Sequence, residues 1–147
     1  MRILITGGDG QVGKAFSRQV QNHELFACSR SELDISDPIS ISKAIESYRP
    51  DVIINCGALT DVDKCETSPE LAMSINGHAV GLLAAQAEKC GASLVQISTD
   101  YVFDGEKDGP YIEADPTKPI SLYGQSKLLG EQLAGSNALI ILSLIHI

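Results

Sequence analysis

Tyr123 and Lys127 form the pattern in this chain best suited to proton chemistry, because they lie four positions apart. On a helix, residues at that spacing share one face, about one turn apart. An ammonium beside a phenol favours the phenolate, so the pattern predicts a lowered pKa for Tyr123. A tyrosine of this kind can pass a proton to a carbonyl oxygen while hydride arrives at the carbon. A tyrosine at a helix start with a purely structural role would show the same spacing.

A run of polar residues follows the apolar segment 94–98, with Thr99 among them. Polar side chains at the carboxyl end of a parallel strand face the ligand crevice of an open α/β sheet. We therefore expect Thr99 to hold the reacting oxygen in place. Thr99, Tyr123 and Lys127 form the predicted catalytic set.

Glycines follow the first apolar run in the spacing G-x-x-G-x-x-G, at Gly7, Gly10 and Gly13. Between a strand and a helix, this spacing predicts a tight turn that brings backbone amides and a helix N-terminus to a pyrophosphate. Gln11 and Val12 belong to the same predicted cofactor loop. We expect Gly13 to let the helix pack closely on the strand. The alternative is a glycine-rich turn without chemical meaning.

The second apolar run, 25–28, is followed by Ser29, Arg30 and Ser31, at a point where a site for a free ribose diol would usually carry an acidic residue. An arginine among hydroxyl groups suits a 2′-phosphate instead, which favours NADPH and leaves NADH possible. A solvent-exposed arginine without a ligand is the alternative. Asp34 and Ile35 follow closely and are predicted to border the adenine.

The third apolar run leads into small residues, among them Gly57 and Ala58. Small side chains at that point let a flat cofactor lie against the backbone. Close packing of a helix on the strand would require the same small residues.

Apolar runs and segments with helical spacing alternate along the chain, which predicts a parallel sheet covered on both faces. The fold class is therefore α/β, a Rossmann-like doubly wound parallel sheet. A loop rich in glycine and proline is expected over 105–119, and Ser68, Pro69 and Gly91 are expected to cap, begin and end the third helix. The predicted strands are 3–6, 25–28, 51–55, 94–98 and 138–142, and the predicted helices are 12–21, 38–48, 68–89 and 121–134.

Composition sets limits on the function. The chain has 147 residues and a formal net charge of −8, which suits one domain and argues against a nucleic-acid-binding face. The sequence shows neither a membrane-spanning run nor a secretory leader, so a cytoplasmic location is expected. The acidic residues show no metal-ligand spacing, and the four cysteines form no C-x-x-C pair, so no metal site is predicted.

Taken together, these segments resemble the dTDP-4-dehydrorhamnose reductase family of the extended short-chain dehydrogenase/reductase superfamily. The resemblance runs from residue 1 to about residue 141 and is carried by ILITGGDGQVG, SELDISD, PDVIINCGALTDVDKCE, STDYVFDG and YGQSKLLGE. It implies NAD(P)H-dependent reduction of dTDP-4-dehydro-L-rhamnose to dTDP-L-rhamnose. It also implies that Asp100 and Tyr101 lie near the sugar, that Thr60 lies near the nicotinamide, and that Lys127 contacts the nicotinamide ribose.

The chain departs from the family pattern at its end. Family members are much longer, and after the last strand they usually carry a tryptophan that helps to shape the sugar site, whereas this chain has none. We expect a C-terminally truncated member, with an incomplete NAD(P)-binding Rossmann domain at 1–141 and a non-family tail at 142–147. Cofactor binding would survive, sugar reduction would be lost, and a full-length parent is a possible homodimer.

Two other functions are compatible with the same residues. The first is a non-catalytic regulatory module resembling the beta subunit of methionine adenosyltransferase. The second is another extended short-chain reductase or an epimerase, which would keep its nicotinamide cofactor tightly bound.

Overall fold

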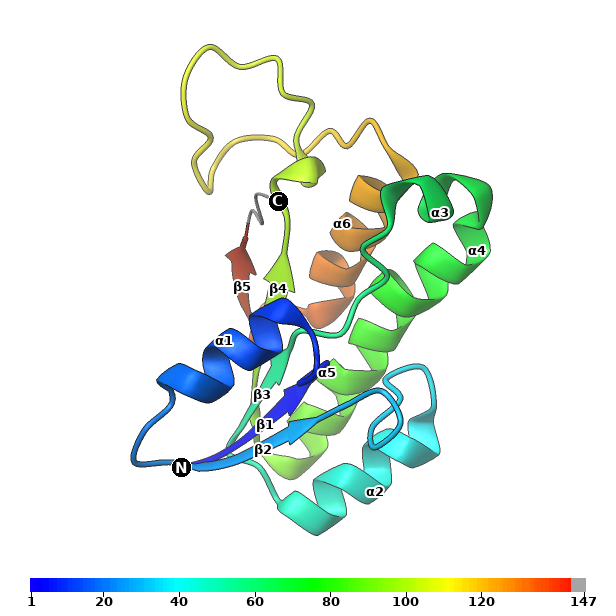
Figure 1. Cartoon of the computed structure of the whole chain (residues 1–147). Coiled ribbons are helices and arrows are strands. Elements are labelled where there is room, and N and C mark those ends of the chain that lie inside the picture. Colours follow the sequence, from blue (N-terminus) through cyan, green and yellow to red (C-terminus); the bar gives the residue numbers. More distant parts are fainter. Residues whose placement is uncertain (144–147) are drawn as a thin grey trace.

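The computed structural model describes residues 1–143, and these residues form five strands flanked by helices (Figure 1). The strands are β1 (Arg2–Thr6), β2 (Glu24–Cys28), β3 (Val52–Asn55), β4 (Ser93–Ser98) and β5 (Leu139–Leu142). The helical segments are α1 (Gln11–Gln19), α2 (Pro38–Tyr48), α3 (Val62–Thr67), α4 (Pro69–Ala72), η1 (Met73–His78), α5 (Ala79–Cys90), η2 (Asp100–Val102) and α6 (Leu122–Ala134).

All four strand pairings are parallel, and the strands lie in the order β2-β1-β3-β4-β5. The order reverses between β1 and β3, because the chain first moves outward to β2 and then returns past β1. In open α/β sheets, the crevice at such a reversal is where ligands bind, at the carboxyl ends of the strands. This confirms the predicted α/β Rossmann-like class and places the candidate site above β1 and β3.

The two faces of the sheet are covered unequally (Figure 1). The larger buried cluster joins the sheet to α2, α5 and α6, with Leu4, Ile41 and Leu83 among its fully buried members. On the opposite face, the described chain places only α1, whose Val12 and Phe16 pack on a smaller cluster. Burial on both faces explains why β1 and β3 read as nearly continuous apolar runs.

The long helix expected over 68–89 is interrupted in the structure. It begins with α4 at Pro69, passes through the π-helical turn η1, and continues as α5 to the left-handed Gly91. Pro69 and Gly91 take the predicted positions, but the Ser68 side chain makes no capping hydrogen bond. The π turn coincides with a close approach of α6, since a Cβ on Gly130 would lie 2.2 Å from the Asn76 carbonyl oxygen.

Two short elements were missed in the sequence. The helix α3 follows the loop after β3 and is capped by Asp61, whose carboxylate accepts a hydrogen bond from the Lys64 amide. The 3₁₀ turn η2 follows β4 directly, and the Thr99 hydroxyl caps it. The predicted loop at 105–119 is confirmed, because this segment contains no helix or strand. Within residues 1–143, no helix is long and apolar enough to cross a membrane.

Candidate active site

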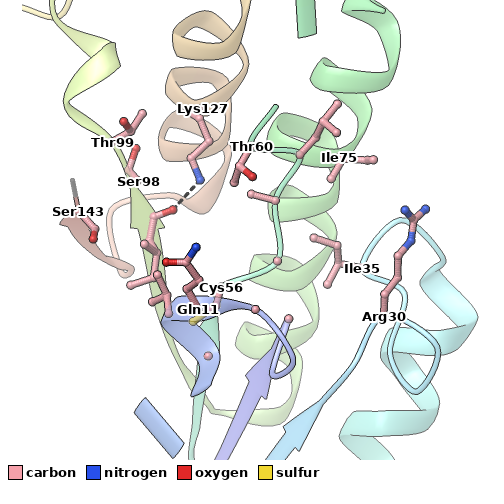
Figure 2. Close-up of a pocket in the computed structure, with 18 of the residues that line it drawn as sticks. Gln11, Arg30, Ile35, Cys56, Thr60, Ile75, Ser98, Thr99, Lys127 and Ser143 are labelled. Carbon is pink, nitrogen blue, oxygen red and sulfur yellow. Dashed lines mark hydrogen bonds between the residues drawn. The ribbon is translucent and has the colours of Figure 1, made fainter. Parts of the chain in front are cut away.

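A cavity of about 580 Å³ opens at the carboxyl ends of β1, β3 and β4. Arg30 lies at one side of it, and Thr99 and Lys127 lie at the other (Figure 2). Every residue that the sequence assigned to a site lines this one cavity. They are Gly7, Gly10, Gln11, Val12, Gly13, Arg30, Asp34, Ile35, Gly57, Ala58, Thr60, Thr99, Asp100, Tyr101, Tyr123 and Lys127.

The glycine loop joins β1 to α1 and forms the floor of the cavity. Gly7 has φ +61°, a left-handed conformation, and a Cβ there would lie 2.9 Å from the Gly57 amide nitrogen. A Cβ on Gly13 would lie 2.4 Å from the Gly7 carbonyl oxygen and 2.8 Å from the Gly8 Cα. Gly13 therefore packs α1 against the glycine loop, not against the strand as predicted. The loop is held as a tight backbone cradle at the start of α1.

The Arg30 side of the cavity is open to solvent. The Arg30 side chain is 74% exposed, and its Nε lies 3.6 Å from Oδ2 of Asp34. Hydrogen bonds from Ser36 to Asp34 hold the pKa of that carboxyl below its usual value, and the Arg30 charge acts in the same direction. An exposed ion pair of this kind contributes little to stability. Arg30 is thus placed where it can contact a phosphate.

Tyr123 and Lys127 lie on α6, as the helical spacing predicts. The predicted lowering of the Tyr123 pKa is wrong: the pKa of this phenol is raised, chiefly by burial. The Thr99 hydroxyl beside the phenol acts in the opposite direction without reversing the effect. Lys127 is not among the groups that shift this pKa. Its ammonium donates a hydrogen bond to the Ile97 carbonyl oxygen, 2.6 Å away (Figure 2). Tyr123 is therefore a protonated phenol at neutral pH, which is the form that a proton donor requires.

Lys127 is buried to an unusual degree for a lysine. It is 4% exposed, and burial lowers its pKa from 10.5 to about 8. The Glu131 carboxylate and the Cys56 thiol act in the opposite direction and raise it. The Cys56 thiol is itself protonated at neutral pH, since burial raises its pKa to about 11.

Thr99 lies between β4 and η2. Its hydroxyl donates a hydrogen bond to the Asp100 carboxylate at 3.1 Å and accepts one from the Tyr101 amide at 3.3 Å. The Tyr101 ring meets the Tyr123 ring edge-on, with centroids 5.5 Å apart. A Cβ on Gly124 would lie 2.2 Å from the Tyr101 carbonyl oxygen, so η2 and the first turn of α6 approach closely. This contact brings Thr99 and Tyr123 together.

Several lining residues were not predicted. Ser98 precedes Thr99 at the end of β4. It belongs to the polar strand end that was expected to face the crevice, but it was given no role in the site. Asp9 and Leu59 lie within the two loops that the sequence did identify. Leu33, Ile75 and Ile97 have no signal apart from being apolar. The cavity residues outside the predicted set are Asp9, Leu33, Cys56, Leu59, Val62, Ile75, Ile97, Ser98 and Ser143.

A chain of buried hydrogen bonds runs beneath the cavity, across the ends of three strands. The Asn55 amide nitrogen donates to the Gln96 side-chain oxygen at 2.7 Å, and the Gln96 amide donates to the Ile97 carbonyl at 2.7 Å. That carbonyl also accepts from Lys127. At the other end, the Thr6 hydroxyl donates to the Asn55 side-chain oxygen. This series of hydrogen bonds connects the end of β1, where the glycine loop begins, to Lys127 of α6.

Comparison with known proteins places this geometry in a family. A family model described as the RmlD substrate binding domain matches residues 1–142. A dTDP-4-dehydrorhamnose reductase of Burkholderia thailandensis is 46% identical over 132 residues, which cover 89% of this chain and 44% of that protein. The chain spans about half the length of the curated relatives it matches.

Solved structures of proteins with the same name as these relatives also match this chain. The crystal structure of a dTDP-4-dehydrorhamnose reductase from Clostridium acetobutylicum has a TM-score of 0.89 and 43% identity, covering 94% of this chain and 50% of that one. A dTDP-4-dehydrorhamnose reductase from Bacillus anthracis, solved in complex with NADP, has a TM-score of 0.89 and 35% identity, covering 93% of this chain and 50% of that one.

The predicted boundary between residues 141 and 142 stays a prediction, and residues 144–147 of the expected tail lie outside the described part of the chain. Leu142, the last residue that the family model matches, is the last residue of β5 and pairs with Ser98. The comparisons therefore cover the whole described sheet and every residue of the candidate site except Ser143. The chain belongs to the family that this model describes, the RmlD substrate binding domain family.

Proposed function

We propose that this chain is the cofactor-binding part of an NADPH-dependent dTDP-4-dehydrorhamnose reductase, which reduces the ketone of dTDP-4-dehydro-L-rhamnose. The observation that carries the proposal is the convergence of Thr99, Tyr123 and the glycine loop on one cavity. The relatives supply the substrate class, since they are named for this activity. The sugar nucleotide would lie beside Asp100 and Tyr101.

The residues present fit a nicotinamide dinucleotide. The cradle at Gly7 and Gly13 has no room for a Cβ, which is the form a backbone site for a pyrophosphate takes. Arg30 would contact the 2′-phosphate, and Asp34 and Ile35 would border the adenine. Gly57, Ala58 and Thr60 would lie along the nicotinamide half. Lys127 would hold the nicotinamide ribose. The reductase solved with NADP supports this choice of cofactor.

When bound, the reduced nicotinamide supplies a hydride to the ketone carbon. The residues of this chain would act on the ketone oxygen. Thr99 would donate a hydrogen bond that orients the ketone, and Tyr123 would transfer its phenolic proton to the oxygen, giving the alcohol. A raised pKa suits Tyr123 to this direction of transfer, because the phenol reaches the reaction protonated.

Titration of the 147-residue chain with NADPH and with NADH, followed by cofactor fluorescence, tests the cofactor assignment. Saturable binding with a preference for NADPH is the expected result. The same titration with Gly7→Val provides the control, because the valine side chain would collide with Gly57. Equal, non-saturating signals for both variants would contradict the assignment.

The substrate assignment needs the full-length protein that carries this segment. Oxidation of NADPH dependent on dTDP-4-dehydro-L-rhamnose is the expected activity. A protein that retains tightly bound nicotinamide through purification and interconverts sugar epimers would instead be an epimerase.

A further inference from the structure

We propose that Glu131 is a positioning residue for the Tyr123–Lys127 pair, because its carboxylate ties α6 to the end of β4 and supplies the negative charge that the buried Lys127 ammonium faces. This inference rests on the proposed function for its catalytic meaning but not for its physical content. Glu131 does not line the cavity, and the sequence patterns did not single it out.

The first support is the geometry of α6 against β4. Lys127 and Glu131 are four residues apart on α6 and so lie on one face of the helix. Each holds one of two successive residues of β4: the Lys127 ammonium donates to the Ile97 carbonyl, and the Glu131 carboxylate accepts from the Ser98 hydroxyl. Together with the close approach of α6 to η1 and η2, these two adjacent anchors hold the height and the rotation of the helix on the strand.

These anchors determine where the reacting groups lie. Thr99 is the residue after Ser98 on the chain, and Tyr123 is one turn before Lys127 on α6. Any slide of α6 along β4 would therefore change the separation between the Thr99 hydroxyl and the Tyr123 phenol. A displacement of about 1 Å in such a pair can cost about two orders of magnitude in rate.

The second support is the balance of charge around Lys127. The groups that bear on it are the Cys56 thiol at the end of β3 and the Glu131 carboxylate. Cys56 is uncharged at neutral pH, so Glu131 is the acidic charge that compensates the ammonium in the described chain. Other titratable groups that contact or act on the first turns of α6 are Cys65 and Glu66 of α3 and Asp100 and Tyr101 of η2. Cys65, Asp100 and Tyr101 act on Tyr123, and the Glu66 carboxylate accepts a hydrogen bond from the Leu122 amide.

The pKa of Glu131 reflects the same interaction with Lys127. Burial raises the pKa of its carboxyl, while the Ser98 hydroxyl and the Lys127 charge lower it. The two groups are therefore coupled, and each should titrate differently when the other is removed.

The test is to follow the titration of Lys127 in the 147-residue chain with isotope-labelled lysine side chains, by NMR. The Lys127 signal is assigned by its loss in Lys127→Met. In the unmodified chain its midpoint is expected near pH 8. In Glu131→Gln, which keeps a hydrogen-bond acceptor for Ser98 but removes the charge, the midpoint is expected to fall by about one pH unit or more. Glu88→Gln, an exposed glutamate on α5, is the matched control and should leave the Lys127 midpoint unchanged.

A reciprocal measurement keeps the proposal testable if Glu131→Gln does not fold. Labelled glutamate carboxyls report the midpoint of Glu131, which should rise in Lys127→Met by the same amount that Lys127 falls in Glu131→Gln. An unchanged Lys127 midpoint in folded Glu131→Gln, or an unchanged Glu131 midpoint in Lys127→Met, would overturn the proposal.

Neither titration uses cofactor or sugar, so a failure of the reductase assignment would leave the outcome intact. In an active full-length enzyme, Glu131→Gln is expected to shift the pH profile of kcat to lower pH without a matching change in the KM for the sugar. A fall in kcat that is equal at every pH would indicate a structural role alone.

Discussion

The two ends of the cavity differ in their exposure to solvent and in the kind of group that they present to a ligand. At the Arg30 end, the glycine loop presents backbone, and the charged groups are exposed. At the Lys127 end, the reacting groups are side chains withdrawn from solvent, and their pKa values are shifted by burial. The first end is suited to holding a charged ligand, and the second to moving a proton.

The difference teaches what each task requires. A dinucleotide is recognised along its length by backbone amides that need no buried charge, so that end can stay open and solvated. Proton transfer requires groups whose pKa values depart from their ordinary values, and burial is the means of achieving that. Changes at the Lys127 end should therefore affect chemistry and titration, whereas changes at the glycine-loop end should affect affinity and the shape of the backbone.

The largest expected effect is at the proton donor. Tyr123→Phe removes the phenolic hydroxyl but keeps the ring that packs against Tyr101. In the full-length protein we expect ketone reduction to fall by roughly 10²- to 10⁴-fold, the range for loss of a general acid, while NADPH affinity stays unchanged. Tyr48→Phe, on α2, is the control and should change neither the rate of ketone reduction nor the affinity for NADPH. A Tyr123→Phe enzyme with near-normal turnover would exclude the role given to this phenol.

The second expected effect is a pH dependence of stability that belongs to Lys127. Its pKa is about 8 in the folded chain and 10.5 when unperturbed, so between these values the unfolded chain binds more protons. The contribution of Lys127 to the free energy of unfolding must then rise with pH across this window and be least favourable below pH 8. A shift of this size corresponds to about 3 kcal/mol.

Urea unfolding at pH 7 and pH 10 measures this contribution. The stability of the unmodified chain relative to Lys127→Met should rise by about 2 to 3 kcal/mol between the two values. Lys89→Met, at an exposed position on α5, should show no such difference. Parallel pH dependences for the unmodified chain and Lys127→Met would mean that burying the Lys127 ammonium does not lower the free energy of unfolding.

The third expected effect is at the glycine loop. Gly13→Ala places a Cβ 2.4 Å from the Gly7 carbonyl oxygen, so the backbone must move, at a cost of about 1 to 3 kcal/mol in the free energy of unfolding. NADPH affinity should fall by about tenfold as the cradle shifts. Gly10→Ala gives the comparison, since its Cβ meets only the Gly7 oxygen at 3.2 Å and its φ of −75° suits alanine. Equal losses of stability in the two variants would contradict the packing described for Gly13.

The sequence predicted the glycine-loop end well because its chemistry depends on spacing that can be read directly. Glycines directly after an apolar run specify both the turn and the helix start, and the structure places them there. The parallel sheet followed from continuous apolar runs for the same reason. What the sequence missed locally were the short elements α3 and η2 and the interruption at η1, where α6 closely approaches Asn76.

For the Lys127 end, the sequence predicted which residues come together but not the direction in which the Tyr123 pKa shifts. Helical spacing brings Tyr123 and Lys127 to one face, and from that alone a lowered phenol pKa follows. The actual direction depends chiefly on the burial of the phenol. The Lys127 ammonium donates its hydrogen bond to the Ile97 carbonyl, which comes from a strand 30 residues away. Glu131 escaped notice for the same reason, because its partner Ser98 is distant in sequence. Spacing along a chain identifies neighbours on one element and carries no information on the groups that a second element presents.

The smallest expected effect is at the solvent-exposed end of the cavity. Arg30→Ala should weaken NADPH more than NADH, because only NADPH carries the 2′-phosphate that Arg30 is proposed to contact. The Arg30 side chain is 74% exposed, so the interaction is screened and the preference should change by only about fivefold, or about 1 kcal/mol. Asp34→Asn supplies the opposite change, since it removes the carboxylate that pairs with Arg30 in this structure and should strengthen NADPH binding slightly. Parallel fluorescence titrations with both cofactors measure the ratio. If Arg30→Ala weakens the two cofactors equally, Arg30 does not read the 2′-phosphate, and the open end of the cavity selects its ligand by backbone contacts alone.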